Sequence, residues 1–179
     1  MDEKELRKFM IEKRAKLSAF ALDKASEKVE NALFSIAGIL DYSTYFVYKD
    51  FRGEIKTDGI ISRLLSSGKI VTYPLLLEEM EAVESKDGVF IKDKFGVDVP
   101  QNYEILSSAV EVVITPLVAC DTNLNRLGFG KGYYDKFFAK FPCLKIGICH
   151  DFQIVDTLSP KPWDIPLDII ITDKRIIRK

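Results

Sequence analysis

The sequence Val110-Glu-Val-Val-Ile-Thr-Pro116 lies past the middle of the chain and decides the fold class. β-branched residues fill almost all of this run, which is typical of a strand covered on both faces. Pro116 has no backbone N–H to donate, so the strand is expected to end at Thr115. A strand covered on both faces indicates an α/β sheet with helices packed against each side.

The segments around this run alternate between strand and helix patterns. Further strands are expected over residues 42–48, 69–73, 144–149 and 168–172, the second of them ended by Pro74, and helices over 57–65 and 131–141. Each strand–helix–strand unit implies a parallel crossover. We therefore predict a three-layer α/β/α fold with a mostly parallel, Rossmann-like sheet and helices on both faces.

The remaining segments are assigned from their local pattern. The first 40 residues predict two helices, the second capped by Asp23 or Ser26. Residues 78–98 carry seven acidic and three basic residues and are expected to form an irregular surface excursion. Residues 174–179 predict a basic tail or an edge strand. No internal repeat or linker interrupts the pattern, so residues 1–179 are expected to form one domain.

Composition excludes several classes of protein. The chain has 179 residues, with 26 basic and 27 acidic side chains, so neither a nucleic-acid partner nor a disordered acidic chain is indicated. No apolar run approaches the roughly 18 residues that a membrane span needs. Three cysteines cannot complete a set of disulfides, which favours a reducing compartment. We expect a cytoplasmic monomer with no membrane partner.

The loop after the central strand carries the strongest chemical signal. Ligands of α/β sheets bind at the carboxyl ends of the strands. Here Gly128, Gly130 and Gly132 alternate just before a predicted helix, whose N-terminus favours anions. Arg126 and Lys131 add cations suited to a polyphosphate. Glycines alone are also compatible with a plain strand-to-helix turn, and the loop matches neither the P-loop nor the Gly-x-Gly-x-x-Gly fingerprint.

The full run Arg126-Leu-Gly-Phe-Gly-Lys-Gly-Tyr-Tyr-Asp135 closely resembles the signature of the 5-formyltetrahydrofolate cyclo-ligase family, also called methenyltetrahydrofolate synthetases. These are ATP- and Mg²⁺-dependent folate enzymes of three-layer α/β fold. The similarity continues in order along the chain, at residues 6–7, 14, 54–57, 68–69, 74, 121, 152–153 and 163–172.

The resemblance implies a role for each matched residue. ATP would be bound by Lys4, Arg7, Arg126, Leu127, Gly128, Phe129, Gly130, Lys131, Gly132, Tyr133 and Tyr134. Catalysis would depend on Arg126, Lys131 and Tyr133. Asp135 and Asp164 would bind Mg²⁺, and Glu54 and Tyr133 would contact the folate. Two departures concern the phosphate site: Phe129 stands where the family often has Arg, and Lys4 is one residue closer to Arg7 than usual.

The implied reaction is the ATP-dependent closure of 5-formyltetrahydrofolate to 5,10-methenyltetrahydrofolate, with release of ADP and phosphate. The γ-phosphoryl group would activate the formyl oxygen, so no nucleophilic side chain is required; this suits a chain with a single His. Two alternatives stay open. One is a non-catalytic nucleotide or folate binder on the same fold. The other is the same chemistry on a different formylated pterin, because the residues after Pro74 depart from the family pattern.

Overall fold

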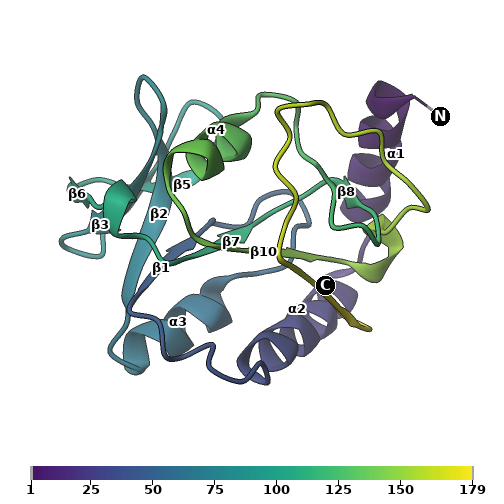
Figure 1. The fold of residues 1–179 in the computed structure, drawn as a ribbon. Coiled ribbons are helices and arrows are strands. Elements are labelled where there is room, and N and C mark those ends of the chain that lie inside the picture. Colours follow the sequence, from purple (N-terminus) through teal and green to yellow (C-terminus); the bar gives the residue numbers. More distant parts are fainter. Residues whose placement is uncertain (1, 179) are drawn as a thin grey trace.

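In a computed structural model of the protein, which describes residues 2–178, an eight-stranded sheet lies between helices (Figure 1). Five neighbouring strands are parallel, and antiparallel strands extend the sheet at both edges. In spatial order the strands are β12 (Ile176–Arg178), β11 (Ile169–Thr172), β10 (Leu144–Cys149), β7 (Val112–Thr115), β1 (Thr44–Val47), β2 (Ile70–Leu76), β3 (Met80–Ser85) and β6 (Tyr103–Ile105). The predicted mostly parallel α/β sheet is confirmed.

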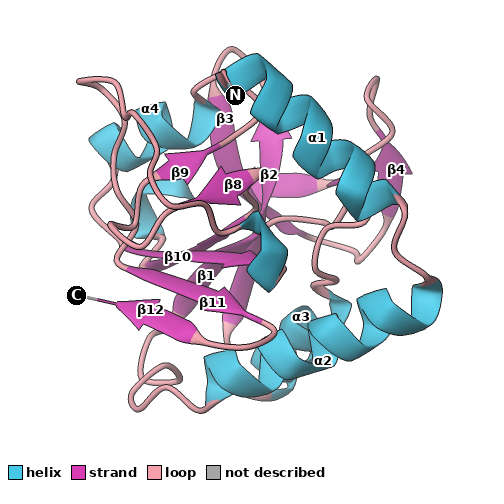
Figure 2. Cartoon of the chain, turned by 90° about the vertical axis from the view of Figure 1, so that its right-hand side faces the viewer, coloured by secondary structure: helices cyan, strands magenta, loops and turns pink. Residues whose placement is uncertain are grey.

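The helices cover both faces of this sheet. In Figure 1, α2 (Ala19–Phe34) and α3 (Asp58–Ser66) lie below it and α4 (Tyr133–Lys140) lies above it. The first helix, α1 (Glu3–Ala15), packs instead on β8 (Ala119–Cys120) and β9 (Arg126–Leu127), a short ladder (Figure 2). Two single 3₁₀ turns complete the helical elements, η1 (Ser107–Ala109) and η2 (Asp151–Gln153). Within residues 2–178, no helix is long and apolar enough to cross a bilayer.

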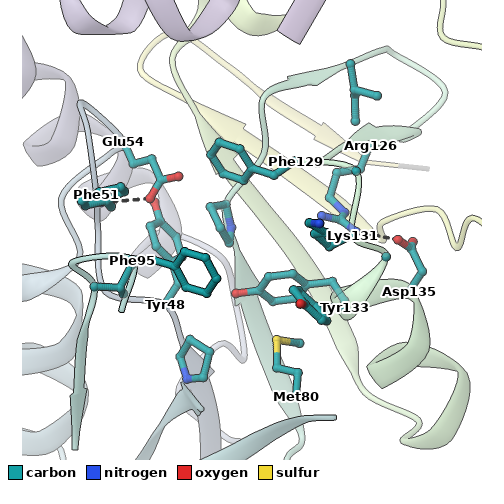
Figure 3. Close-up of a pocket in the computed structure, with 18 of the residues that line it drawn as sticks. Tyr48, Phe51, Glu54, Met80, Phe95, Arg126, Phe129, Lys131, Tyr133 and Asp135 are labelled. Atoms are coloured by element: carbon teal, nitrogen blue, oxygen red, sulfur yellow. Dashed lines mark hydrogen bonds and ion pairs between the residues drawn. The ribbon is translucent and has the colours of Figure 1, made fainter. Parts of the chain in front are cut away.

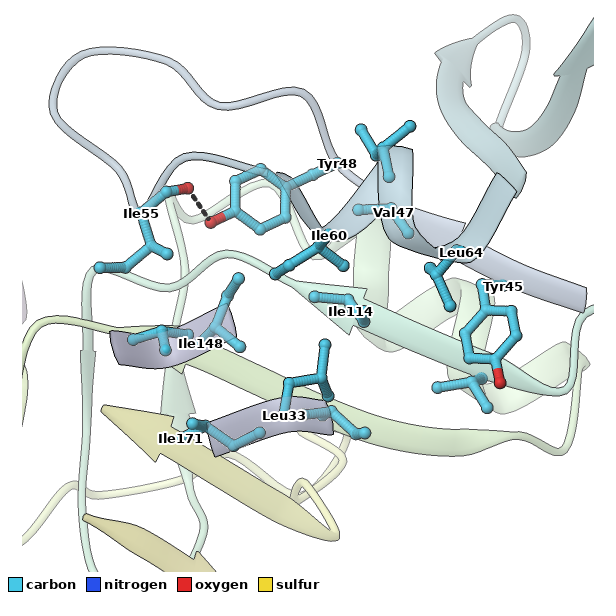
Figure 4. Packing of buried hydrophobic residues seen from close by; sticks show 14 of the residues in the cluster. Leu33, Tyr45, Val47, Tyr48, Ile55, Ile60, Leu64, Ile114, Ile148 and Ile171 are labelled. Carbon is cyan, nitrogen blue, oxygen red and sulfur yellow. Dashed lines mark hydrogen bonds between the residues drawn. The ribbon is translucent and has the colours of Figure 1, made fainter. Parts of the chain in front are cut away.

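Two apolar layers result from the alternation of side chains along the strands. On β1, Tyr45 and Val47 are buried in the cluster that contains Leu33 of α2 (Figure 4). Phe46 points to the other face, where its ring centroid lies 4.9 Å from that of Phe137 on α4. Successive strand residues face opposite sides, so a fully apolar strand must be covered on both faces.

The prediction that Pro74 ends the second strand was wrong. β2 continues through Pro74, which lies opposite Ala82 of antiparallel β3. The pairing of β1 with β2 ends at Thr72, so beyond that residue β2 has a partner strand on one side only. A proline is tolerated there because no ladder on the open side requires its N–H.

The prediction of an irregular excursion over residues 78–98 was also wrong. Its first part is β3, in which Met80, Ala82 and Val83 are buried. A hairpin of β4 (Phe90–Lys92) and β5 (Asp98–Pro100) follows. The acidic residues between the apolar ones concealed a strand that is buried mainly on one face.

Other local predictions had mixed outcomes. The second helix is capped by Ser18, whose hydroxyl accepts from the Ala21 N–H, whereas Asp23 and Ser26 lie inside the helix. The C-terminal edge strand is confirmed as β12. Lys179 lies outside the described residues.

The topology places a crevice between β1 and β7. The chain leaves β1 through α3 toward β2, and it leaves β7 through α4 toward β10 on the other side. The two connections diverge from neighbouring parallel strands, so the carboxyl ends of β1 and β7 form a topological switch point, where ligands bind in such sheets.

Candidate functional site

A cavity of about 590 Å³ opens at this switch point. Its walls come from α1, the loop after β1, the β2–β3 strands, the β4–β5 hairpin and the glycine loop after β7. Figure 3 shows Glu54 and Phe95 on one side of it, with Phe129 and Lys131 across from them. A volume of this size is in the range of sites for small organic ligands and cofactors.

The glycine loop forms one complete wall. Every residue from Arg126 to Asp135 lines the cavity. Gly130 and Gly132 have φ of 92° and 67°, and Gly132 is the N-cap of α4, so the loop turns directly into the helix N-terminus. Side chains are disfavoured in this left-handed conformation. The loop therefore exposes backbone to the cavity beside the positive end of a helix, an arrangement that suits phosphate.

The N-terminal helix brings one of its two predicted cations to this wall. Arg7 donates through Nε to the Gly128 carbonyl at 2.9 Å, and its Nη2 pairs with Glu3 at 2.9 Å. Lys4 is exposed on the same helix and does not line the cavity.

An ion pair crosses the inner end of the glycine loop. Arg126 Nη2 lies 3.0 Å from Asp135 Oδ2, and both side chains are largely buried. The other Asp135 oxygen accepts from the Ile165 N–H at 3.2 Å, and the Arg126 guanidinium carbon lies 5.3 Å from the centroid of the Tyr134 ring. Arg126 Nε is buried without a partner among the described residues. An arginine held in this way retains donor capacity for a ligand.

The two predicted metal ligands both line the cavity. Asp164 accepts from the Lys161 N–H at 2.8 Å, and the next residue, Ile165, donates to Asp135. Residues 2–178 contain no group of three or more His, Cys, Asp or Glu side chains placed to hold a metal ion by themselves. Mg²⁺ is usually held by one or two carboxylates together with substrate phosphates. Asp135 and Asp164, beside the glycine loop, fit that ligand set.

Glu54 forms the opposite wall as a buried acid. It is 6% exposed, and its Oε2 accepts from the Phe51 N–H at 3.0 Å. Its Oε1 lies 3.6 Å from Nη1 of Arg14, which is itself 2% exposed. Burial raises the pKa of the Glu54 carboxyl to about 7, although Arg14 and the Phe51 N–H act in the opposite direction. Glu54 is thus poised to titrate near neutral pH.

A glycine holds the Glu54 loop against α1. Gly53 has φ of 75°, and a Cβ there would lie 2.9 Å from the Arg14 carbonyl oxygen. Gly53→Ala is expected to lower the free energy of unfolding by about 2 to 4 kcal/mol, because left-handed backbone and overpacking both cost energy. Urea denaturation measures this loss. Gly68→Ala is the matched control: Gly68 has φ of 72° with open space around it, so about 1 to 2 kcal/mol is expected there. Equal losses in the two variants would contradict the close approach at Gly53.

Aromatic side chains surround the mouth of the cavity. Phe95 on the β4–β5 hairpin, Phe129, Tyr133 and Trp163 are all at least 37% exposed and line it. Tyr133 and Met80 approach the same space from below in Figure 3. Flat apolar surfaces that stay exposed are suited to cover the rings of a ligand.

Sequence reasoning missed part of this site. Phe95 and Met80 were hidden in the stretch expected to be irregular, and Arg14 has no local signal that separates it from a solvated helix face. Only the fold reveals that α1 turns Arg14 into the protein. The glycine loop, Arg7, Glu54 and Asp164 were identified from sequence, and the structure brings them to one cavity.

Comparison with known proteins agrees with this geometry. The model of the 5-formyltetrahydrofolate cyclo-ligase family matches residues 1–173. The chain belongs to this family. A cyclo-ligase of Mycoplasma pneumoniae is 29% identical, with 97% of this chain and all of that protein covered. One of Escherichia coli K12 is 32% identical over 74% of this chain and 79% of its own length.

A solved cyclo-ligase relative has the same architecture. The NMR structure of 5,10-methenyltetrahydrofolate synthetase from Aquifex aeolicus superposes with a TM-score of 0.89 at 30% identity, and the match covers 99% of this chain and 93% of the other. The resemblance that the glycine loop indicated is therefore confirmed for the whole fold. These two relatives are named cyclo-ligases and the solved structure is a methenyltetrahydrofolate synthetase, the other name of that enzyme, which identifies the chain as an enzyme of that class.

Proposed function

We propose that the protein closes 5-formyltetrahydrofolate to 5,10-methenyltetrahydrofolate, with ATP as the second substrate. The observation that carries the proposal is the single cavity in which a cationic glycine loop faces the buried acid Glu54. The loop suits a triphosphate. Glu54 suits a neutral ring with N–H groups, because a carboxylate only accepts hydrogen bonds. A phosphoryl donor and a folate would thus meet in one space.

The chemistry follows from the poor reactivity of the formyl group. The formyl oxygen attacks the γ-phosphorus, and the bond to ADP breaks with its electron pair on ADP. N10 then attacks the formyl carbon and loses its proton, the C–O bond breaks, and phosphate leaves with that oxygen. The protein's task is alignment and charge stabilisation.

Side chains of the glycine loop would perform that task. Arg126 and Lys131 would donate to the oxygens of the transferring group, with loop N–H groups beside them, and Arg7 would position the loop through the Gly128 carbonyl. Tyr133 would lie where nucleotide and folate meet. We leave Lys4 outside this set, because it is exposed away from the cavity. Asp135 and Asp164 would hold Mg²⁺, which neutralises phosphate charge when bound.

The direct test is the absorbance of the methenyl product. Purified protein, 5-formyltetrahydrofolate, ATP and Mg²⁺ are expected to give product and ADP in equal amounts, and omission of ATP is expected to give neither. Binding of ATP without either product would favour a non-catalytic nucleotide binder. Turnover with another formylated pterin but not with this one would place the same chemistry on a different substrate. That the enzyme is a monomer in the cytoplasm stays a prediction from the sequence.

The acid limb of the pH profile is expected to follow Glu54. Burial raises the pKa of Glu54 to about 7, and only the ionised carboxylate can accept from two neighbouring N–H groups without presenting an O–H of its own. Thus kcat/KM for the folate should rise about tenfold per pH unit below 7 and level off above it, since this parameter reports the free enzyme. In Glu54→Gln this limb should vanish and kcat/KM should fall about 10- to 100-fold. An unchanged limb in Glu54→Gln would assign the titration to another group.

A further inference from the structure

Arg14 is a buried cation whose hydrogen bonds are incomplete. It is 2% exposed, yet Nη1 makes only long contacts, 3.4 Å to the Leu117 carbonyl and 3.6 Å to Glu54 Oε1. Its Nε is buried and has no partner among residues 2–178. A guanidinium has five N–H donors, and leaving them unsatisfied in the interior is costly. Arg14 lines the cavity, so a ligand there can accept from guanidinium N–H groups that the protein leaves without a short hydrogen bond.

The surroundings fix Arg14 and Glu54 side by side. The Phe51 N–H holds Glu54 from one side, and Gly53 packs on the backbone of Arg14. His150 Nε2 lies 3.0 Å from the Gly53 carbonyl oxygen and supports this loop. The wall therefore presents a fixed row of donors next to a fixed acceptor.

A folate has the complementary pattern on one edge of its pterin ring. The 2-amino group and N3–H are donors, and the C4 carbonyl oxygen beside them is an acceptor. We propose that Arg14 is a specificity-determining residue that donates to the C4 carbonyl oxygen while Glu54 accepts from the neighbouring N–H groups. This inference rests on the proposed function. It assigns to Arg14 a contact with the substrate that is distinct from the phosphate contacts of Arg126 and Lys131.

Position favours the ring over the phosphates as the partner of Arg14. The guanidinium carbon lies 5.9 Å from the centroid of the Phe129 ring. Phe129 belongs to the glycine loop and borders Arg14 with an apolar face. The Glu54 carboxylate also lies beside Arg14, and its negative charge weakens the attraction of Arg14 for a polyanion such as ATP.

The charged and titratable groups around Glu54 give the proposal a second consequence. They are Arg14 on α1, Tyr48 and Asp50 in the loop after β1, Tyr134 on α4 and, through Gly53, His150. Of these, Arg14 lowers the pKa of Glu54, whereas burial and Asp50 raise it. Loss of Arg14 should move the acid limb of folate binding to higher pH.

The decisive experiment compares two ligands that differ only at C4. Calorimetry without ATP measures the affinity of 5-formyltetrahydrofolate and of the same molecule with sulfur in place of the C4 oxygen, which keeps N3–H. The wild type should bind the oxo form about 10-fold more tightly, because a thiocarbonyl sulfur is a weaker hydrogen-bond acceptor than a carbonyl oxygen. In Arg14→Met the preference should fall to about threefold or less. An unchanged preference would overturn the proposal.

Kinetics separate recognition from a structural role. Arg14→Gln should raise the KM for the folate about 10- to 100-fold and leave the KM for ATP within about twofold. It should also shift the acid limb of the pH profile to higher pH. Arg14→Lys, which keeps the charge, should restore the position of the limb. Arg63→Gln is the matched control, because Arg63 lies on α3 over Phe34, away from the cavity.

The remaining outcomes are equally informative. A lowered melting temperature in Arg14→Gln and Arg14→Lys, with both KM values raised alike, would show that Arg14 only anchors α1, and the proposal would fail. If the wild type bound the oxo form preferentially but made no methenyl product, the proposed reaction would fail while the recognition by Arg14 would stand.

Discussion

Replacing Lys131 by methionine is expected to lower kcat about 100- to 1,000-fold, which is the usual effect of removing one donor to the charge that develops in a transition state. Lys131 lines the cavity from the glycine loop, and its side chain is exposed. Its replacement therefore disturbs little packing, and the melting temperature should stay the same. The KM for the folate should change less than kcat, because Lys131 lies across the cavity from Glu54 (Figure 3).

The control for this prediction is Lys136→Met. Lys136 is exposed one turn and a half further along, on α4, and does not line the cavity. It should keep the wild-type kcat and KM values. Steady-state assays of methenyl formation at saturating ATP measure both variants. A Lys131→Met enzyme with wild-type kcat would remove Lys131 from the phosphoryl-transfer step.

Replacing Asp135 by asparagine is expected to lower turnover about 1,000-fold, because a carboxylate that helps to hold Mg²⁺ contributes several kcal/mol to charge stabilisation. Asparagine can still accept from the Ile165 N–H, so the fold of the loop should persist. Arg126 would lose its counter-charge in a buried position. We expect the free energy of unfolding to fall by about 1 to 3 kcal/mol.

Two measurements distinguish these effects. The Mg²⁺ concentration for half-maximal activity should rise in Asp135→Asn, and urea denaturation gives the change in stability. Asp135→Ala should be less stable than Asp135→Asn, since it also leaves the Ile165 N–H without its acceptor. If Asp135→Asn kept both full turnover and the wild-type Mg²⁺ requirement, Asp135 would be only a structural partner of Arg126.

The sheet was predictable because its strands have a local sequence pattern that is typical of buried strands. Val112–Thr115 and Ile169–Thr172 are continuous runs of β-branched residues, and helices with a visible helical spacing lie between the strands in the sequence. β3 was missed because its acidic side chains alternate with buried ones, so composition pointed to a surface loop. The continuation of β2 through Pro74 depends on which neighbours β2 has, and a single strand's sequence does not contain that information.

The part of the site that lies in one continuous segment was predictable. The part that forms where distant segments meet was not. The glycine loop is continuous, so its role can be inferred from ten residues. Arg14 matters because it is buried and lies next to Glu54, which is 40 positions further along the chain. Phe95 reaches the cavity only because β4 and β5 fold back over it. Such contacts are properties of tertiary structure.

The walls of the cavity extend from Glu3 on α1 to Asp164, nearly the whole length of the chain. During synthesis the first helix leaves the ribosome long before the glycine loop does, and β10 and β11 follow later still. Parallel strands joined by crossovers pair over long sequence separations and therefore fold slowly. A nascent or truncated chain consequently has no assembled site with which to sequester ATP or a reduced folate. Ligand binding can thus be expected to select complete, folded molecules.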